Sequence, residues 1–361
     1  MYSKIGIILS SVRIAATLSI IDFELKSLNM LESQNMSACD SFTARRYLRN
    51  RHLMTLAGNF LRRRNTLPAP EASLFRVAED AQVLCHCHWQ AQAEERGTVI
   101  IVHGLEGSSS SQYVIGTSTK AWETGMNVVR MNMRTCGGTE RLASTLYHSG
   151  MSGDVGAVVC EVLERKRVRW VALVGYSMGG NLVLKLAGEL GASAPPELKA
   201  VAAVSPAADL AASADAMHEW SNRVYEWKFL LSLMRRFRRK SALFPEIYKN
   251  VSSWPRSIRQ FDHEITAPYC GFSSADDYYT RAAAARVIDK IIHPTLVIHA
   301  ADDPFIRLLP QTRDKMLANP NITLLETPHG GHCAFLAQPN GYDGRWAERR
   351  IIQFLCQDGG Q

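Results

Sequence analysis

Short apolar runs alternate with amphipathic stretches through the middle of the chain, from about residue 75 to residue 205. Each run has the length and the nearly continuous apolar character of a strand that is buried on both faces. We expect strands at residues 83–89, 98–102, 127–131, 170–174 and 200–205, and helices at residues 155–167 and 178–190. This alternation predicts the α/β fold class, with a mostly parallel central sheet flanked by helices.

The alternation stops at about residue 209 and resumes near residue 290. The intervening segment is rich in helix formers and aromatic residues, and it contains the basic run 235–240. Strands are then expected at residues 295–299 and 321–326, and a closing helix at residues 345–356. An insertion at about residues 209–290 of an α/β sheet predicts a helical cap. Its aromatic residues predict an apolar cleft for part of a substrate, and they can also serve as the core of the cap itself.

The first 75 residues do not follow the strand–helix pattern. Residues 37–75 are rich in arginine and predict a basic N-terminal arm that is helical until Pro68 and Pro70 break it. Residues 1–36 leave three interpretations open: an ordinary terminal helix, a weak membrane anchor or signal, or an extraneous stretch ahead of a true start at Met30 or Met36. Arg13 interrupts the apolar stretch at residues 5–23, which argues against a membrane-spanning helix.

The composition is that of an ordinary folded protein, with 46% hydrophobic and 21% charged residues in a chain of 361. A disordered chain and a polytopic membrane protein are therefore excluded. The net charge of +7 permits attraction to anionic surfaces. The sequence carries no nucleic-acid module with base-stacking aromatic residues. We expect the basic arm and the run 235–240 to serve solubility or a weak contact with an anionic membrane surface, and we expect no nucleic-acid or protein partner.

Eight cysteines are scattered along the chain without a C-x-x-C pair. This spacing predicts reduced, mostly buried thiols and a cytoplasmic protein that is at most peripheral to a membrane. The run from Cys85 to His88 alternates cysteine with histidine, as a metal site might. Alternate residues of a strand point to opposite faces, so these four side chains cannot converge on one ion. We expect no metal.

The sequence Gly175-Tyr176-Ser177-Met178-Gly179 joins an expected strand to an expected helix. A G-x-S-x-G motif in this strand–turn–helix context predicts a nucleophilic serine, Ser177, on a sharp turn at the start of the helix. The flanking glycines are required because a Cβ at either position would collide with the neighbouring strand and helix.

A glycine-rich turn, His103-Gly104-Leu105-Glu106-Gly107, follows the strand at residues 98–102. Such a turn supplies a backbone N–H group to an oxyanion. We assign the oxyanion hole to the backbone N–H groups of Leu105 and Met178. His103 is interpreted as a positioning residue of this loop and not as a catalytic base.

An acid and a histidine follow the last two expected strands. Asp302 and Asp303 come after the strand at residues 295–299, and His332 comes after the strand at residues 321–326. A serine, an acid and a histidine in this order predict nucleophilic catalysis. In hydrolases of this fold the acid usually stands three residues beyond the small residue that ends the strand. Ala300 is that residue and selects Asp303, while Asp302 remains the alternative.

Rival motifs are missing from the sequence. It contains no Walker-type loop, no G-x-G-x-x-G after a strand and no H-E-x-x-H pair, so nucleotide binding and zinc proteolysis have no support. A serine at position 177 argues against the aspartate-nucleophile chemistry of epoxide and haloalkane hydrolysis.

These motifs resemble the YheT-like branch of the α/β-hydrolase superfamily, a group of bacterial hydrolases related to eukaryotic embryogenesis-associated and lipid-acting hydrolase-domain esterases. The resemblance covers the chain from about Arg45 to Phe354 and does not reach the residues before Met30. Thr135 departs from the family, which usually has glycine after the preceding arginine. The further marks of the resemblance are residues 47–53, 103–108, 132–138, 147–150, 175–180, 276–279, 302–305 and 330–332.

The resemblance implies a serine hydrolase whose domain spans residues 76–361 and carries the cap. Ser177 would attack short- to medium-chain acyl esters, including glycerides, through an acyl-enzyme, with His332 as the base and Asp303 as its partner. No cofactor is implied. One alternative is an acyltransferase that uses the same three residues to move the acyl group to an alcohol. Another is a non-catalytic binding protein on the same fold.

Overall fold

The computed structural model describes residues 41–358, except residues 62, 64 and 249–253. The chain divides into two units, residues 1–43 and residues 44–361, and every element named below belongs to the second unit. The expectations for an anchor, a signal or an alternative start before residue 37 lie outside the described residues.

A sheet of eight strands forms the centre of the second unit, in the order β1-β2-β4-β3-β5-β6-β7-β8. β1 and β2 pair antiparallel, as do β2 and β4, and the remaining pairs are parallel. The mostly parallel sheet confirms the predicted fold class. The strands are β1 (Glu71–Ala78), β2 (Ala81–His88), β3 (Gly97–Val102), β4 (Asn127–Met131), β5 (Trp170–Tyr176), β6 (Leu198–Val204), β7 (Thr295–Ala300) and β8 (Ile322–Thr327).

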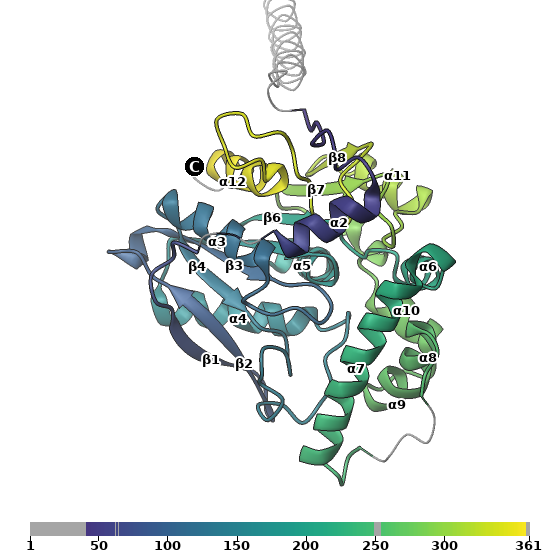
Figure 1. Ribbon diagram of the computed structural model, residues 1–361. Helices are drawn as coiled ribbons and strands as arrows, with labels where there is room; N and C mark the ends of the chain where they lie inside the picture. Colours follow the sequence, from purple (N-terminus) through teal and green to yellow (C-terminus); the bar gives the residue numbers. More distant parts are fainter. Residues whose placement is uncertain (1–40, 62, 64, 249–253, 359–361) are drawn as a thin grey trace, which may run out of the picture. The chain divides into compact units, whose positions relative to one another are not determined.

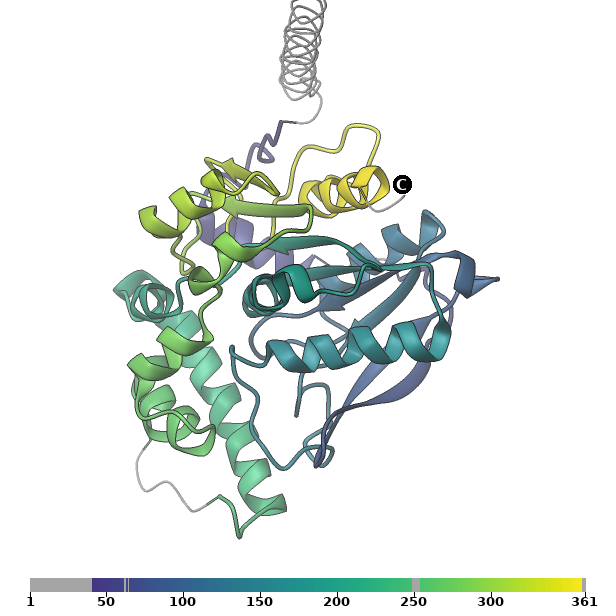
Figure 2. The same ribbon diagram turned by 180° about the vertical axis from the view of Figure 1, so that it is seen from behind.

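Helices cover both faces of this sheet (Figures 1 and 2). One face carries α3 (Gln112–Glu123) and α12 (Trp346–Asp358), and the other carries α4 (Ser152–Lys166) and α5 (Met178–Leu190). All side chains of β3, β4 and β5 are buried because helices lie on both sides of them. Two further helices lie at the edges, α2 (Arg51–Phe60) against α3 and α11 (Pro310–Ala318) beside β8.

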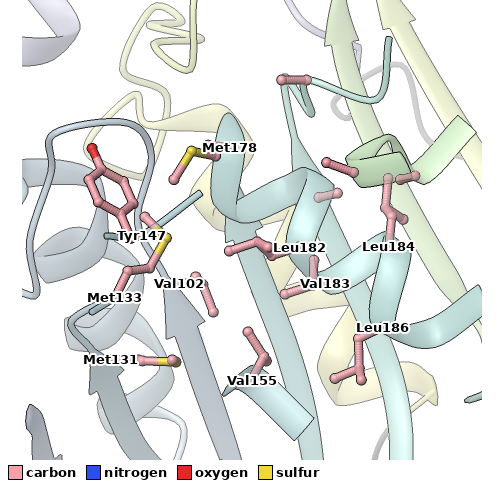
Figure 3. Packing of buried hydrophobic residues seen from close by; sticks show 14 of the residues in the cluster. Val102, Met131, Met133, Tyr147, Val155, Met178, Leu182, Val183, Leu184 and Leu186 are labelled. Atoms are coloured by element: carbon pink, nitrogen blue, oxygen red, sulfur yellow. The ribbon is translucent and has the colours of Figure 1, made fainter. Parts of the chain in front are cut away.

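The core between the sheet and α5 includes Met178, the residue that follows Ser177 (Figure 3). Leu182 and Leu186 of α5 project toward the sheet, where Val102 and Met131 end their strands. This packing fixes the start of α5, and therefore the turn that precedes it, against the central strands.

The insertion between β6 and β7 is helical, as the sequence predicts. Its longest element is α7, which runs for 21 residues from Arg223 to Leu243. The other elements of this cap are α6 (Leu210–Met217), a 3₁₀ turn (Trp220–Asn222), α8 (Ile258–Phe261), a π-helical turn (Asp262–Thr266), α9 (Ala267–Tyr269), α10 (Ala275–Ala282) and two 3₁₀ turns (Ala284–Arg286 and Ile288–Lys290).

The basic arm is more closely built into the domain than the sequence predicts. Its helix is α2, and its last residues belong to β1, so the expected boundary at residue 75 falls inside a strand of the sheet. The sequence did not predict β1, because Phe75 is the one buried side chain of this strand and the strand therefore lacks a clear apolar pattern.

The basic run 235–240 is only partly exposed to solvent. Arg236 and Lys240 are buried, with Arg236 bound to Glu106 and Lys240 bound to backbone carbonyl groups. Arg239 pairs with Glu140, and Arg238 lies 5.0 Å from the ring centre of Trp254. Helical periodicity separates these side chains, because consecutive positions of a helix point in different directions.

Cys85 and Cys87 lie in the core on the α4 side of the sheet, while the ring of His88 lies against Trp122 of α3 on the other side. The described cysteines are free thiols; Cys160 and Cys356 are exposed, so burial is less general than expected. In the described part of the chain, the potential metal-binding side chains do not gather in groups of three. Among the same residues, no helix combines the length and apolar character needed to cross a bilayer.

Candidate active site

Ser177 lies on the turn between β5 and α5, with its backbone in the left-handed region at φ +55°. A Cβ on Gly175 would stand 2.2 Å from the carbonyl oxygen of Gly179, and a Cβ on Gly179 would stand 2.4 Å from that of Val102. Both distances are impossible for a side chain, so only glycine permits α5 to approach the sheet this closely. The turn holds the Ser177 hydroxyl at the carboxyl end of the strands.

His332 connects the serine to an acid. Its Nε2 atom lies 3.0 Å from Ser177 Oγ, and its Nδ1 atom lies 2.8 Å from Asp303 Oδ2. Asp303 is fully buried, and its Oδ1 atom accepts the backbone N–H groups of Phe305 and Ile306 at 3.1 and 2.9 Å. The three residues therefore form a continuous hydrogen-bonded chain from a buried carboxylate to an alcohol.

Asp302 has a different environment. Its Oδ1 atom accepts the backbone N–H of Gly331 at 3.0 Å, and its Oδ2 atom lies 3.2 Å from Nδ1 of His329. Asp302 thus contacts the loop that carries His332, while Asp303 contacts the imidazole itself.

The electrostatics of the pair favour a charged carboxylate and a basic imidazole. Burial alone would raise the pKa of Asp303, but the adjoining His332 outweighs it and the pKa lies below the usual value. Burial alone would lower the pKa of His332, but the Cys333 thiol and the Asp303 carboxylate beside the ring outweigh it and the pKa lies above the usual value. A raised pKa makes this imidazole a stronger base than a free histidine side chain.

The turn from His103 to Gly107 lies against Ser177, since a Cβ on Gly104 would stand 3.0 Å from the serine Cβ. The N–H of Gly104 donates to the Tyr113 hydroxyl at 2.9 Å, and the N–H of Glu106 donates to the Tyr147 hydroxyl at 3.1 Å. Between them, the N–H of Leu105 has no hydrogen-bond partner among the described residues. It is therefore available to a ligand oxygen.

Met178 supplies a second such group, because it is the first residue of α5 and its N–H has no acceptor within the helix. Leu105, Met178 and Ser177 line the same cavity. A negative charge that develops there meets two backbone donors and the positive end of a helix dipole.

His103 occupies the position of a loop brace. It is fully buried, with Nδ1 donating to the carbonyl of Gly104 at 2.7 Å and Nε2 accepting the N–H of Met133 at 3.1 Å. Burial lowers its pKa to about 4, so the ring is neutral at physiological pH. Both ring nitrogens are occupied by the backbone.

Sequence analysis missed an ion pair that joins the cap to this turn. Glu106 accepts Nε of Arg236 in α7 at 2.8 Å and the hydroxyl of Tyr147 at 2.6 Å, and it also accepts the Ser232 hydroxyl. Arg236 in addition donates to the carbonyl of Thr135. The glutamate and the arginine are 130 residues apart in the chain, so no local pattern links them. Arg236 also stands among other arginines of the run 235–240, and the sequence does not show which of them is buried.

Sequence analysis also missed the contribution of α2. The backbone N–H of His332 donates to Oγ1 of Thr55 at 2.9 Å, and that hydroxyl donates to the carbonyl of Arg51 at 2.7 Å. The α2 helix therefore holds the loop that presents the histidine. Cys333, whose Sγ lies 3.6 Å from Nε2 of His332, is a further neighbour that no motif indicated.

Thr135, the one departure from the family pattern, has an unusual backbone conformation. Its φ is +64°, a left-handed conformation that glycine adopts without strain and threonine resists. The side chain is buried, and its hydroxyl has no hydrogen-bond partner within the described residues. The left-handed conformation and the unpaired hydroxyl are two sources of local strain at this position.

A cavity of about 710 Å³ opens beside Ser177 and His332, between the carboxyl ends of the strands and the cap. This volume lies within the range of small-molecule sites, about 300–1,000 Å³. Its walls are mostly aliphatic and aromatic. The cap contributes Leu210, Ala214, Met217, Tyr225, Phe229, Leu233, Phe237, Ile258 and Phe261.

Comparisons with known proteins agree with this geometry. Residues 97–339 match the family model for the alpha/beta hydrolase fold. The protein YheT of Escherichia coli strain K12, which is named as an esterase, is 30% identical over 92% of this chain and 97% of its own length. A monoacylglycerol lipase of Saccharomyces cerevisiae is 28% identical over 71% of this chain and 58% of its own length.

Solved structures show the same fold at lower sequence identity. The Pyrococcus furiosus esterase Pf2001 aligns with a TM-score of 0.54 over 80% of this chain and 91% of its own, at 16% identity. The family match covers strands β3 to β8, the serine turn and the histidine loop described above. The chain therefore belongs to the α/β-hydrolase fold family, in its YheT-like branch.

Proposed function

We propose that this protein is a serine esterase that cleaves carboxylic esters of short- to medium-chain acyl groups, glycerides among them. The observation that carries the proposal is the hydrogen-bonded sequence of Ser177, His332 and Asp303 at the wall of an apolar cavity. The names of the related esterase and monoacylglycerol lipase favour the same class of substrate.

In the first half of the reaction, Ser177 Oγ attacks the ester carbonyl carbon and its proton passes to Nε2 of His332. The new C–O bond moves an electron pair onto the carbonyl oxygen, and the N–H groups of Leu105 and Met178 bind that oxyanion. Asp303 holds the imidazole in the required tautomer and stabilises its positive charge. When the intermediate collapses, the bond to the alcohol breaks and Nε2 returns the proton to the leaving alkoxide.

In the second half, water replaces the alcohol. His332 removes a proton from the water, which attacks the acyl carbon, and the oxyanion forms again between Leu105 and Met178. Collapse then breaks the bond to Ser177 Oγ, which takes the proton back from Nε2 of His332, and the acid is released. Each oxyanion donor of this kind contributes on the order of 10²–10³ in turnover. Apart from the ester and water, both halves of the reaction use only side chains and backbone groups of this chain.

The cavity accounts for the acyl part of the substrate. Its wall next to the serine comes from α6 and α7 of the cap and is aliphatic and aromatic, so it favours a hydrocarbon chain over water. A chain of a few methylene groups gains about 0.8 kcal/mol for each group buried. Medium-chain esters should therefore be better substrates than acetyl esters.

The test is labelling with a fluorophosphonate probe, which reacts with an activated serine. The native protein should be labelled and should hydrolyse p-nitrophenyl esters, and Ser177→Ala should lose both properties while keeping its fold. Ser110→Ala is a matched control, because Ser110 lies at the wall of the same cavity. No labelling of the folded native protein would overturn the proposal. Adding ethanol and measuring free acid against ethyl ester separates hydrolysis from acyl transfer.

A further inference from the structure

Two helices at the mouth of the cavity expose apolar side chains to solvent. On α2 these are Leu53, Leu56 and Phe60, which recur at helical spacing on the outer side of the helix. On the turn before α7 and on α7 itself they are Trp220, Val224 and Trp227, which again recur at helical spacing. Trp220 is 90% exposed, Val224 79% and Phe60 69%, whereas large apolar side chains are normally buried. We call these six residues the mouth patch.

The two halves of the mouth patch lie near each other, because side chains of α2 contact side chains of α7. The ring of His52 stacks on that of Tyr225 at 5.7 Å. Lys228 Nζ lies 5.7 Å from the centre of the Phe60 ring. Leu56, Phe60 and Val224 are exposed and also line the cavity that contains Ser177, so the patch lies at an opening of this cavity.

The exposed charges around the mouth patch are mainly cationic. Arg49, Arg223 and Lys228 are exposed beside it, and residues 44–61 contain no acidic residue. The acid within this part of α7, Glu226, is buried and accepts the backbone N–H of Ile258 at 3.0 Å. Glu219 is paired with Arg307. The segments that carry the patch therefore expose mainly cationic charge, and their acids are paired, Glu226 with Arg223 at 3.6 Å and Glu219 with Arg307.

We propose that the mouth patch docks the protein on an anionic lipid surface, with Trp220 and Trp227 inserted among the headgroups. Tryptophan prefers the boundary between headgroups and acyl chains, and exposed Lys and Arg side chains are attracted to anionic lipids, each by about 1 kcal/mol. An apolar partner protein would not require the excess of cations on these segments. The docked orientation places the cavity opening against the lipid, so that an ester can enter without crossing water. Delivery of substrate rests on the proposed function, but docking itself does not.

The test separates docking from catalysis by using the full-length Ser177→Ala protein, which cannot consume the lipid. Its partition onto phosphatidylcholine vesicles with about 30% phosphatidylglycerol is measured by flotation. We expect binding that weakens with salt and with removal of the anionic lipid. Replacing Trp220 and Trp227 together by alanine should lower the partition coefficient about tenfold or more. Trp254→Ala is the matched control, because Trp254 is an exposed tryptophan of the cap outside the cavity wall.

Catalytic competence is measured in parallel with the two tryptophan substitutions placed in the native protein. Neither side chain lines the cavity, so fluorophosphonate labelling and hydrolysis of a soluble ester should stay within twofold. Undiminished vesicle binding by the double variant would overturn the proposal, and so would equal loss with Trp254→Ala or no vesicle binding at all. A native dimer that dissociates in the double variant, without a change in lipid binding, would assign the patch to a second copy. Failure of labelling would reject the esterase proposal and leave docking to be judged by flotation.

Discussion

At the scale of single residues, the site is built from backbone conformations that side chains normally avoid. Ser177 has φ +55°, and its N–H donates to the carbonyl of Val204 in β6 at 2.9 Å, which holds it in place. A non-glycine residue in the left-handed backbone region destabilises the folded state by on the order of 1–3 kcal/mol, and it persists where its surroundings fix that conformation. The other non-glycine residues with positive φ around the site are Glu106, Thr135, Ser205, Cys333 and Phe335.

The two adjacent acids should differ sharply on substitution. Asp303→Asn removes the carboxylate that fixes the tautomer of His332, so turnover should fall by roughly three to four orders of magnitude, as in the serine-protease precedent. Asp302→Asn changes a carboxylate that binds the N–H of Gly331 and His329, so the loss should be far smaller. Turnover of an ester substrate by the purified, folded variants decides between them. A larger loss in Asp302→Asn would reverse the assignment.

The raised pKa of His332 predicts an alkaline requirement for activity. The base must be neutral to accept the proton of Ser177, so kcat/KM should fall as pH drops through the pKa of the free enzyme. Because the Cys333 thiol and the Asp303 carboxylate raise that pKa despite burial, the midpoint should lie above the ordinary value of 6.5. The same shift stabilises the folded state below the unfolded-state pKa, and this contribution is lost as pH rises through the folded-state pKa.

The measurement is kcat/KM between pH 5 and 10, with hydrolysis in the presence of Ser177→Ala subtracted as background. A flat profile between pH 6 and 9, or a midpoint below 6.5, would contradict the prediction.

At the scale of elements, α2 is part of the site although it lies far from the serine turn in sequence. Thr55 Oγ1 accepts the N–H of His332, and a Cβ on Gly331 would stand 2.8 Å from the carbonyl of Arg51. A Cβ on Gly58 would in turn stand 2.6 Å from the Cβ atom of Ala334. The helix therefore packs directly on the histidine loop and restricts the position of the imidazole.

Thr55→Val should test this positioning role, since it keeps the shape of the buried side chain and removes its oxygen. The N–H of His332 then loses its acceptor, which costs about 1–3 kcal/mol, and kcat/KM should fall about tenfold. Thr55→Ser keeps the acceptor and should restore kcat/KM to within about twofold of the native value. The rate of fluorophosphonate labelling should follow the same order. Equal activity of the two variants at equal thermal stability would show that Thr55 has a packing role alone.

The sequence predicted elements well where one pattern dominates and poorly where patterns compete. The helix from Met178 to Leu190 has the predicted bounds because a glycine turn starts it and an apolar face continues it. α3 was not predicted, since Gly116, Thr117 and Ser118 are weak helix formers. The serine motif, the spacing after Ala300 and the chain order together suggested Ser177, Asp303 and His332, with Asp302 as the alternative acid. No local pattern encodes the contact of Thr55 with His332, because 277 residues separate them and only the fold brings them together.

At the scale of the whole domain, the cap both covers the cavity and contacts two loops of the candidate site. Arg236 of α7 binds Glu106 beside the proposed oxyanion hole, and Asn222 donates to the carbonyl of Pro304, next to Asp303, at 2.6 Å. The cap thus contacts both the loop that would bind the oxyanion and the loop that carries the acid. Movement of the cap relative to the sheet would disturb both loops at once, so we infer that substrate access and site geometry are coupled.

The cavity between cap and sheet should decide which acyl chains are accepted. Ala214 of α6 lines it, and Ala214→Phe would fill part of the space that the proposal assigns to the acyl chain. Losing room for two methylene groups costs about 1.6 kcal/mol, or roughly fifteenfold in kcat/KM. The loss should therefore appear with p-nitrophenyl octanoate and be small with p-nitrophenyl acetate. Ala212→Phe, on the same helix but outside the cavity wall, should leave the ratio of the two substrates unchanged. Equal losses on both esters in folded Ala214→Phe would place the acyl chain elsewhere, because a filled acyl site must penalise the longer chain more.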